Sequence, residues 1–218
     1  MIKAIFWDND GVLVDTEILY YRACKETFAS IGIDLSEDLY VEYFLKKGSG
    51  TWHLAEQKGL DDDTIIKLRQ ERNKIYSDLL RNHSKVITGA EETLNKLHDK
   101  FSMGVVTSSR KDHFDIIHQS TGFLKYFDFI LTSEDYTETK PSPDPYLKAV
   151  AKSGLKKEEC IVIEDSERGL RAALSAGLKC YVIPTSLTKN SNFSGAEKIL
   201  NNISEVPRIL EQTISQKN

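Results

Sequence analysis

The sequence predicts an α/β protein in which an open parallel sheet carries helices on both faces and a further group of helices is inserted into one connection. Three observations lead to this prediction. Five short segments consist of continuous apolar, often β-branched residues, most of the segments between them have helical patterns, and one connection is far too long for a single helix. Continuous rather than alternating apolar residues are typical of strands buried on both faces, as in a parallel sheet.

The five predicted strands are separated by helical patterns and turn residues. They lie at Lys3–Trp7, Met103–Thr107, Phe127–Leu131, Cys160–Ile163 and Cys180–Ile183. Parallel strands need crossover connections, so the alternation of strand and helix predicts right-handed crossovers and an open sheet.

Residue types that are typical of helix ends occur in the segments between these strands. Thr88 and Glu91 have the spacing of a capping box, which predicts a helix that continues to about residue 99. Pro143 is compatible with the first turn of a helix that ends near Gly154. Gly177 follows a short helical pattern at 167–176 and is expected to end that helix.

The connection between the first two strands is exceptional in length. About 95 residues separate Trp7 from Met103, whereas a single crossover helix needs roughly a dozen. Helical patterns occupy most of this connection, at 16–30, 39–45, 51–58 and 61–81. We therefore predict that residues 17–81 form an inserted helical domain, and that residues 1–16 and 82–218 form the domain that contains the sheet.

The composition excludes several classes of protein. The 218 residues are 40% hydrophobic and 28% charged, as in ordinary globular domains, and 29 basic against 33 acidic side chains give a formal net charge of −4. This balance does not indicate a surface that binds nucleic acid or an anionic membrane.

No apolar segment approaches the roughly 18 to 20 residues of a membrane helix and no secretory signal is present, so we expect a cytoplasmic protein. The widely spaced Cys24, Cys160 and Cys180 are expected to be reduced and buried.

The segment after the first strand carries the strongest chemical pattern. It reads Asp8-Asn9-Asp10-Gly11, and ligands in open α/β sheets bind beyond the carboxyl ends of the strands. Two carboxylates so close together repel one another unless a cation lies between them or one holds a proton, which suits a Mg²⁺ site and an acid–base pair. Gly11 permits a turn whose backbone N–H groups face an anion. Taken alone, the pattern is equally compatible with an ordinary Asx-rich turn.

Three further polar segments follow other predicted strands. Thr107 and Ser108 follow the second strand with hydroxyl groups and free amides that suit phosphate oxygens. Lys140 lies in a proline-bracketed loop, where its ammonium group can neutralise phosphate charge. Glu164 and Asp165 end the fourth strand with two acids, which are costly to place together without a metal or a cationic partner. The joint pattern predicts one phosphate and metal site.

Nearby polar residues are assigned structural roles. Ser109 and Asp15 are expected to cap the helices that follow them. The five histidines lack metal-ligand spacing, and their helical surroundings favour surface or capping roles.

Together, these four motifs and their order resemble the haloacid dehalogenase superfamily of phosphohydrolases, in the subgroup similar to β-phosphoglucomutase. The resemblance covers nearly the whole chain. It implies a Rossmann-like core and a helical cap, residues 17–81, that shapes the leaving-group pocket. The dehalogenases lack an acid at the position of Asp10, so its presence favours phosphoryl transfer over carbon–halogen cleavage.

The resemblance also implies a role for each motif residue. Asp8 is the nucleophile that forms an aspartyl phosphate, and Asp10 is the general acid that protonates the leaving group and then activates water. Thr107 binds the transferring phosphoryl group, and Lys140 links that group to Asp8. The remaining phosphate-binding residues are Asn9, Gly11 and Ser108.

Mg²⁺ is the cofactor that the resemblance implies. Asp8, Asp165 and the carbonyl oxygen of Asp10 would hold the ion, and Glu164 is an additional ligand or an orienting group. The positive charge is needed because a carboxylate that attacks a dianionic phosphate meets electrostatic repulsion.

The expected reaction is hydrolysis of a small phosphorylated metabolite, such as a sugar phosphate or a nucleotide-like monophosphate. β-Phosphoglucomutase-like enzymes carry a histidine where this chain has Tyr20 and an arginine in the first cap loop, which here reads Lys46-Lys47-Gly48-Ser49-Gly50. This difference favours a phosphatase, although Lys46 or Lys47 leaves open a β-phosphoglucomutase-type phosphotransferase. A non-enzymatic phosphate-binding protein is the other alternative. We expect no nucleic-acid or membrane partner and a monomer or weak homo-oligomer.

Overall fold

A parallel sheet organises the chain in this computed structural model, which describes residues 1–215. The described residues form six strands in the order β3-β2-β1-β4-β5-β6, and every neighbouring pair is parallel. The strands are β1 (Ala4–Trp7), β2 (Ser102–Val106), β3 (Phe129–Leu131), β4 (Cys160–Glu164), β5 (Lys179–Val182) and β6 (Lys198–Ile199). The predicted α/β class and the five predicted strands are confirmed. The edge strand β6 was not predicted, because two exposed residues leave no apolar pattern.

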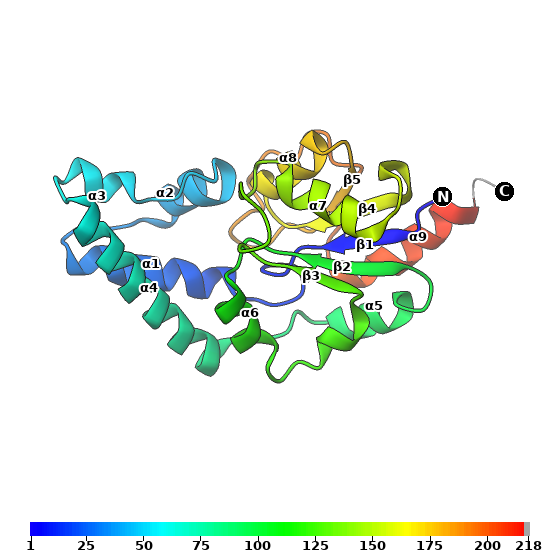
Figure 1. Ribbon diagram of the computed structural model, residues 1–218, viewed down its shortest axis with the longest axis horizontal. Helices are drawn as coiled ribbons and strands as arrows, with labels where there is room; N and C mark the ends of the chain where they lie inside the picture. The colour runs from blue at the N-terminus through cyan, green and yellow to red at the C-terminus, as the bar shows by residue number, and fades with distance from the viewer. Residues whose placement is uncertain (216–218) are drawn as a thin grey trace.

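Helices cover both faces of the sheet (Figure 1). In β1, Ile5 and Trp7 pack on one face, Ala4 and Phe6 pack on the other, and all four are fully buried. The first face is covered by α5 (Ala90–Leu97), α6 (Lys111–His118) and α9 (Val206–Ser215), and the second by α7 (Asp144–Ser153) and α8 (Glu167–Ser175). Three short 3₁₀ turns lie between these elements: η2 (Phe123–Tyr126), η3 (Lys157–Glu159) and η4 (Ile203–Glu205). The predicted Rossmann-like arrangement is therefore confirmed.

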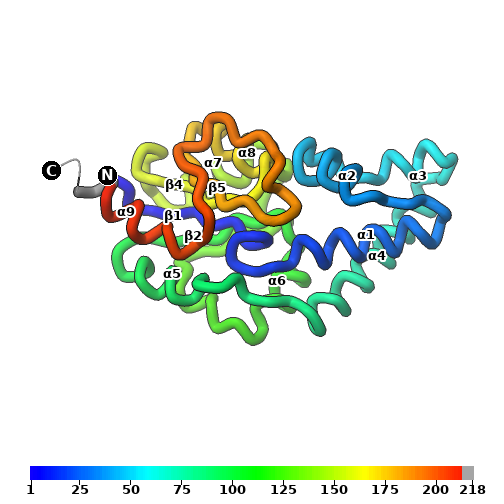
Figure 2. Tube along the Cα trace, turned by 180° about the vertical axis from the view of Figure 1, so that it is seen from behind, coloured from blue at the N-terminus to red at the C-terminus, as the bar shows by residue number. Residues whose placement is uncertain are grey.

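A second group of helices lies beyond one end of the sheet (Figures 1 and 2). We call it the helical insertion. It comprises α1 (Glu17–Ser30), α2 (Glu37–Tyr40), the π-helical turn η1 (Val41–Lys46), α3 (His53–Gln57) and α4 (Asp62–His83). The helices α1 and α4 run side by side and connect this group to the sheet. Phe28, Tyr40 and Leu45 lie in a separate apolar cluster within the insertion.

Two predicted helix starts differ from the observed ones. The capping box at Thr88 is wrong, because α5 begins at Ala90, after Gly89, and has no side-chain cap. Gly89 adopts φ +84°, a left-handed conformation that cannot lie inside a right-handed helix. Pro143 directly precedes α7 rather than lying within its first turn.

Two expectations about composition can be compared with the structure. The three cysteines are buried and form no disulfide, as predicted. Within residues 1–215, no helix combines the length and the apolar character that crossing a membrane requires.

Candidate active site

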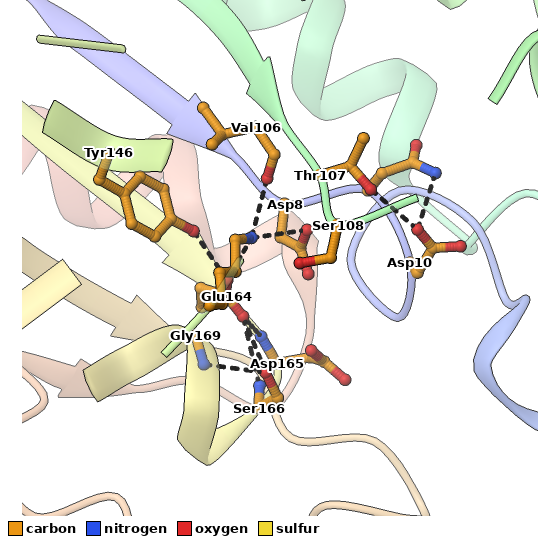
Figure 3. A network of polar contacts seen from close by, with 12 residues as sticks. Asp8, Asp10, Val106, Thr107, Ser108, Tyr146, Glu164, Asp165, Ser166 and Gly169 are labelled. Carbon is orange, nitrogen blue, oxygen red and sulfur yellow. Dashed lines mark hydrogen bonds and ion pairs between the residues drawn. The ribbon is translucent and has the colours of Figure 1, made fainter. Parts of the chain in front are cut away.

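A buried lysine connects two acids at the carboxyl edge of the sheet. The two acids, Asp8 and Glu164, are labelled in Figure 3. The Nζ atom of Lys140 lies 2.9 Å from Oδ1 of Asp8 and 2.7 Å from Oε1 of Glu164. It also donates to the carbonyl oxygen of Val106 at 2.8 Å. Asp8 follows β1, Glu164 ends β4, and Lys140 belongs to the segment between β3 and α7. The three donors of the ammonium group are therefore all used.

The three charged groups of this network are not equally stabilised. Burial opposes the charge on Lys140, yet Asp8 and Glu164 raise its pKa, so the side chain stays protonated. Burial also acts against ionisation of Glu164, but the contact with Lys140 lowers its pKa. For Asp8, burial and the neighbouring Glu164 outweigh Lys140 and raise the pKa to about 7. One ammonium group therefore stabilises one of the two carboxylates well, and Asp8 needs further positive charge to be ionised.

Asp165 joins Asp8 and Glu164 in a cluster that fits a metal ion. One carboxylate oxygen from each residue lies within 4.8 Å of the others. The Oδ2 atom of Asp165 is buried and has no hydrogen-bond partner, and burial raises the pKa of this group well above its ordinary value. Gly11 adopts φ +82°, and a Cβ atom there would lie 2.5 Å from that Oδ2 atom. Glycine at this position therefore keeps space beside Asp165, and the all-oxygen donor set suits a hard cation such as Mg²⁺.

Glu164 has protein partners on both of its oxygen atoms. Oε1 accepts hydrogen bonds from Lys140 and from the hydroxyl of Tyr146, each at 2.7 Å. Oε2 accepts from the backbone N–H of Asp165 and from Oγ of Ser166, each at 3.2 Å. A Cβ atom on Gly169 would lie 2.0 Å from this carboxylate, so α8 can begin here only because that residue is glycine. These contacts fix the orientation of Glu164.

Asp10 is surrounded by hydrogen-bond donors. Its Oδ2 atom accepts from Oγ1 of Thr107 at 3.1 Å and from Oγ of Ser109 at 2.8 Å. Nδ2 of Asn9 donates to the same oxygen at 3.3 Å, and Thr16 donates to Oδ1. Every contact donates to the carboxylate, so these donors fix the orientation of the Asp10 side chain.

Two residues that were expected to cap helices do not. Ser109 donates to Asp10, and α6 begins at Lys111 without a side-chain cap. α1 also lacks one, so the capping role expected for Asp15 is wrong. In both places the hydroxyl next to the helix start, from Ser109 or Thr16, binds the Asp10 carboxylate instead.

A buried histidine, His118, orients Asn9. The surface or capping role expected for the histidines is therefore wrong for this residue. Nε2 of His118, on α6, lies 2.8 Å from Oδ1 of Asn9, and its Nδ1 lies 2.9 Å from the hydroxyl of Thr121. Burial lowers the pKa of His118 to about 4, so the ring is neutral at physiological pH. With Nδ2 of Asn9 donating to Asp10, Oδ1 must accept from an Nε2–H group, and this fixes the histidine tautomer. The available signal was a histidine beside Phe114 and Ile117 on the apolar face of its helix.

The sheet edge and the helical insertion enclose a pocket of about 130 Å³. Asp8, Asp10 and Ser108 line it from the sheet side, and Tyr20 and Phe44 line it from the insertion. Two arginines that the sequence reasoning did not single out also line it: Arg72 of α4 and Arg168 of α8. Every predicted site residue lies at this one edge of the sheet, because each follows a parallel strand or belongs to the loop before α7.

The fold is that of a known enzyme class. Residues 5–183 match the family model described as haloacid dehalogenase-like hydrolase. The chain belongs to this family and is a hydrolase, which confirms both the resemblance seen in the sequence and the prediction of an enzyme.

Several relatives align with nearly the whole chain. The chain is 28% identical to the protein CbbY of Rhodobacter capsulatus over 209 residues, 90% of this chain and 91% of that protein. It is also 28% identical to a "phosphorylated carbohydrates phosphatase" of Thermotoga maritima, over 94% of this chain and all of that protein. A crystal structure of a CbbY mutant from Rhodobacter sphaeroides with xylulose-1,5-bisphosphate superposes with a TM-score of 0.80 at 27% identity, covering 94% of this chain and 96% of that one.

Proposed function

We propose that this protein is a Mg²⁺-dependent phosphatase that hydrolyses a small phosphorylated metabolite through a phosphorylated Asp8. The observation that carries the proposal is the position of Asp8, which lies between Lys140 and the free oxygen of Asp165 and two residues before a second acid, Asp10. A protein that only binds phosphate has no need of both a nucleophile and an acid.

The proposed reaction has two steps. A carboxylate oxygen of Asp8 attacks phosphorus, the ester P–O bond breaks, and the leaving alcohol takes a proton from Asp10. Water then attacks phosphorus, Asp10 accepts its proton, and the P–O bond to Asp8 breaks, which releases inorganic phosphate and restores the Asp8 carboxylate. The covalent intermediate divides one difficult displacement into two easier ones. Asp10 serves both steps because its carboxylate is held by hydroxyl and amide groups beside the nucleophile.

The transferring phosphoryl group is expected to meet donors on several sides. Lys140 supplies an ammonium group next to Asp8, and Thr107 and Ser108 lie at the end of β2. The backbone of Asn9 and Gly11 completes the proposed phosphate site. Fixed donors of this kind stabilise the charge of a loose transition state without reorganisation.

Mg²⁺ would be held by the side chains of Asp8 and Asp165 and by the carbonyl oxygen of Asp10. When bound, it would supply the positive charge that the nucleophile and the phosphate oxygens require. Both oxygens of Glu164 accept hydrogen bonds from the protein, and this supports an orienting role for that residue.

The helical insertion is proposed to act as the cap, with residues 17–81 selecting the leaving group. Its aromatic side chains Tyr20 and Phe44 line the same pocket as the acids Asp8 and Asp10. The names of the relatives, one a phosphatase of phosphorylated carbohydrates and one crystallised with a sugar bisphosphate, support a sugar phosphate or a similar monoester as substrate.

A phosphate-release screen tests this function. Purified protein is incubated with sugar phosphates, nucleoside monophosphates and phosphorylated acids, in Mg²⁺ and in excess EDTA. We expect phosphate release from at least one class, dependent on Mg²⁺. Transfer of the phosphoryl group to a second position of the sugar would instead support the phosphotransferase, and no turnover across the panel would show the proposal to be wrong.

A further inference from the structure

A second buried histidine lies where the sheet meets the helical insertion. His113 belongs to α6, is only 3% exposed, and lines the pocket of about 130 Å³ together with Asp8 and Asp10. At this point α6 packs against α4 of the insertion. The rings of His113 and Tyr76 of α4 lie nearly perpendicular, with their centres 4.8 Å apart. The surface or capping role expected for the histidines is therefore wrong for His113 as well.

One ring nitrogen of His113 is unpaired. Its Nε2 atom is buried and forms no hydrogen bond with any of the described residues. His118, on the same helix, differs in this respect, because its two ring nitrogens lie within hydrogen-bond distance of Thr121 and Asn9. Buried polar atoms are nearly always paired. An unpaired nitrogen on a residue that lines the pocket therefore indicates a partner that the ligand brings.

The ring of His113 is neutral at physiological pH. Burial lowers its pKa, and this effect outweighs the opposing effects of Asp112 and of the backbone of Asn73. The neighbouring guanidinium groups of Arg110 and Arg72 lower the pKa further. In a neutral imidazole, Nε2 is either a donor or an acceptor, depending on the tautomer. A hydroxyl group suits both cases because it can donate and accept, whereas an anion gains no charge pairing from this ring.

The position of His113 relates it to the leaving group. Ser109, four residues earlier in the chain, lines the same pocket and donates to the Asp10 carboxylate at 2.8 Å. Asp10 is the residue proposed to protonate the leaving oxygen. The carbon atoms attached to that oxygen therefore enter the pocket that His113 lines, and a hydroxyl on one of them can reach the unpaired nitrogen.

We propose that Nε2 of His113 forms a hydrogen bond with a hydroxyl group of the leaving group and thereby selects esters that carry a hydroxyl within a few carbon atoms of the phosphate. The inference rests on the proposed phosphatase function and adds a specificity residue to it. An ester without that hydroxyl leaves Nε2 unpaired in the pocket, and a site built to bond a hydroxyl discriminates against such an analogue.

A matched series of synthetic esters tests the inference. Linear alkyl phosphates with two to four carbons are prepared with a terminal hydroxyl, methoxy or methyl group, and phosphate release is measured. We expect kcat/KM to be roughly fivefold to tenfold higher for the hydroxyl end than for the methyl end at one of these lengths. In H113L this ratio should fall toward one, whereas H113Q, whose amide can donate or accept, should retain part of it.

His83 provides the matched control. It is exposed in the last turn of α4 and does not line the pocket, so H83L should keep the full ratio. If His113 only packs α6 against α4, H113L changes kcat/KM of all three esters by the same factor and the ratio stays as in wild type. That result overturns the inference. The methoxy ester identifies the tautomer, because an ether oxygen accepts but does not donate: it keeps the preference if Nε2 donates and loses it if Nε2 accepts.

Binding measured without turnover separates this inference from the proposed function. The D8N protein with Mg²⁺ is titrated with the hydroxyl-ended and methyl-ended esters, by calorimetry and by ¹⁵N NMR of the imidazole rings. We expect tighter binding of the hydroxyl end and a shift of the Nε2 resonance of His113, which is assigned by its absence from H113L/D8N. This result supports the inference even if the wild type hydrolyses none of the esters. Equal affinities, or a resonance that the hydroxyl-ended ester leaves unchanged, overturn it even if hydrolysis is fast.

Discussion

The sheet edge and the helical insertion both place charged side chains at one pocket, but they hold them differently. At the sheet edge, Lys140 lies within 2.9 Å of two carboxylates, and each group has a fixed partner within the chain. In the insertion, Arg72 rests on aromatic rings and bonds only to neutral groups. We infer that the side chains at the sheet edge are held in place for catalysis, whereas the charge of Arg72 in the insertion remains available to the substrate.

Replacement of Asp8 by asparagine should have the largest effect. The amide cannot form an acyl phosphate, so we expect turnover to fall by more than ~10⁴-fold with every substrate, as for other covalent nucleophiles. Turnover is measured by phosphate release, and circular dichroism checks that the variant is folded. Substantial activity in this variant would place the nucleophile elsewhere.

Replacement of Lys140 by methionine should damage both stability and turnover. It leaves Asp8 and Glu164 buried side by side without their cation, which is expected to cost about 3 to 5 kcal/mol of the free energy of unfolding. Urea denaturation measures the loss. Added Mg²⁺ should restore part of the stability, and a variant as stable as wild type without metal would contradict the electrostatic description of the edge.

Stability should decrease in acid because of His118. Its pKa is lowered to about 4 in the folded protein, so between the ordinary value of about 6.5 and pH 4 the unfolded chain binds the proton more strongly. The histidine therefore favours unfolding as the pH falls through this range, by on the order of 3 kcal/mol near pH 4. Urea denaturation at pH 7 and pH 4.5 should show that the free energy of unfolding decreases more for wild type than for H118Q. Equal decreases in the two proteins would show that the His118 ring is not held neutral in the folded state.

The same histidine should affect catalysis modestly. In H118L the buried Oδ1 of Asn9 loses its donor, and the amide that holds Asp10 is free to turn. We expect kcat to fall roughly tenfold with little change in KM. Glutamine can donate to the same oxygen, so H118Q should recover most of kcat. Equal loss in both variants would indicate a packing role alone.

The smallest effect is expected from Lys47→Ala in the insertion. Lys47 is exposed, pairs with Glu42 at 3.1 Å and lies over the ring of Tyr43. Surface pairs of this kind contribute about 1 kcal/mol or less. Steady-state kinetics with the substrate found in the phosphate-release screen should change by less than about threefold. A large rise in KM would show that Lys47 contacts the substrate, which would contradict the surface role.

The sequence was informative where function depends on strand ends and less so where it depends on helices. Asp8, Thr107 and Glu164 each follow or end a continuous apolar strand, so the parallel sheet predicts that they meet. Arg72 and Arg168 lie on helices whose rotation and packing no short pattern reveals, and both resemble solvated charges in the sequence. His118 was missed because its partner, Asn9, lies 109 residues away.

The helix caps expected at Asp15 and Ser109 were misassigned for a related reason. The hydroxyl groups at these helix starts, from Thr16 and Ser109, donate to the nearby carboxylate of Asp10, and neither helix has a side-chain cap. The capping box at Thr88 was wrong because Gly89 takes a left-handed conformation, and a side chain at this position would clash with Ser204 of a distant turn.

Direct detection of the phosphorylated enzyme tests the central claim. Wild-type protein with Mg²⁺ is mixed with a substrate identified in the phosphate-release screen and quenched in acid within one turnover, and peptides are analysed by mass spectrometry. We predict one phosphoryl group on the peptide that contains Asp8, absent in D8N and absent in EDTA. A phosphoryl group on another residue, or turnover with no phosphorylated peptide at any quench time, would contradict the account.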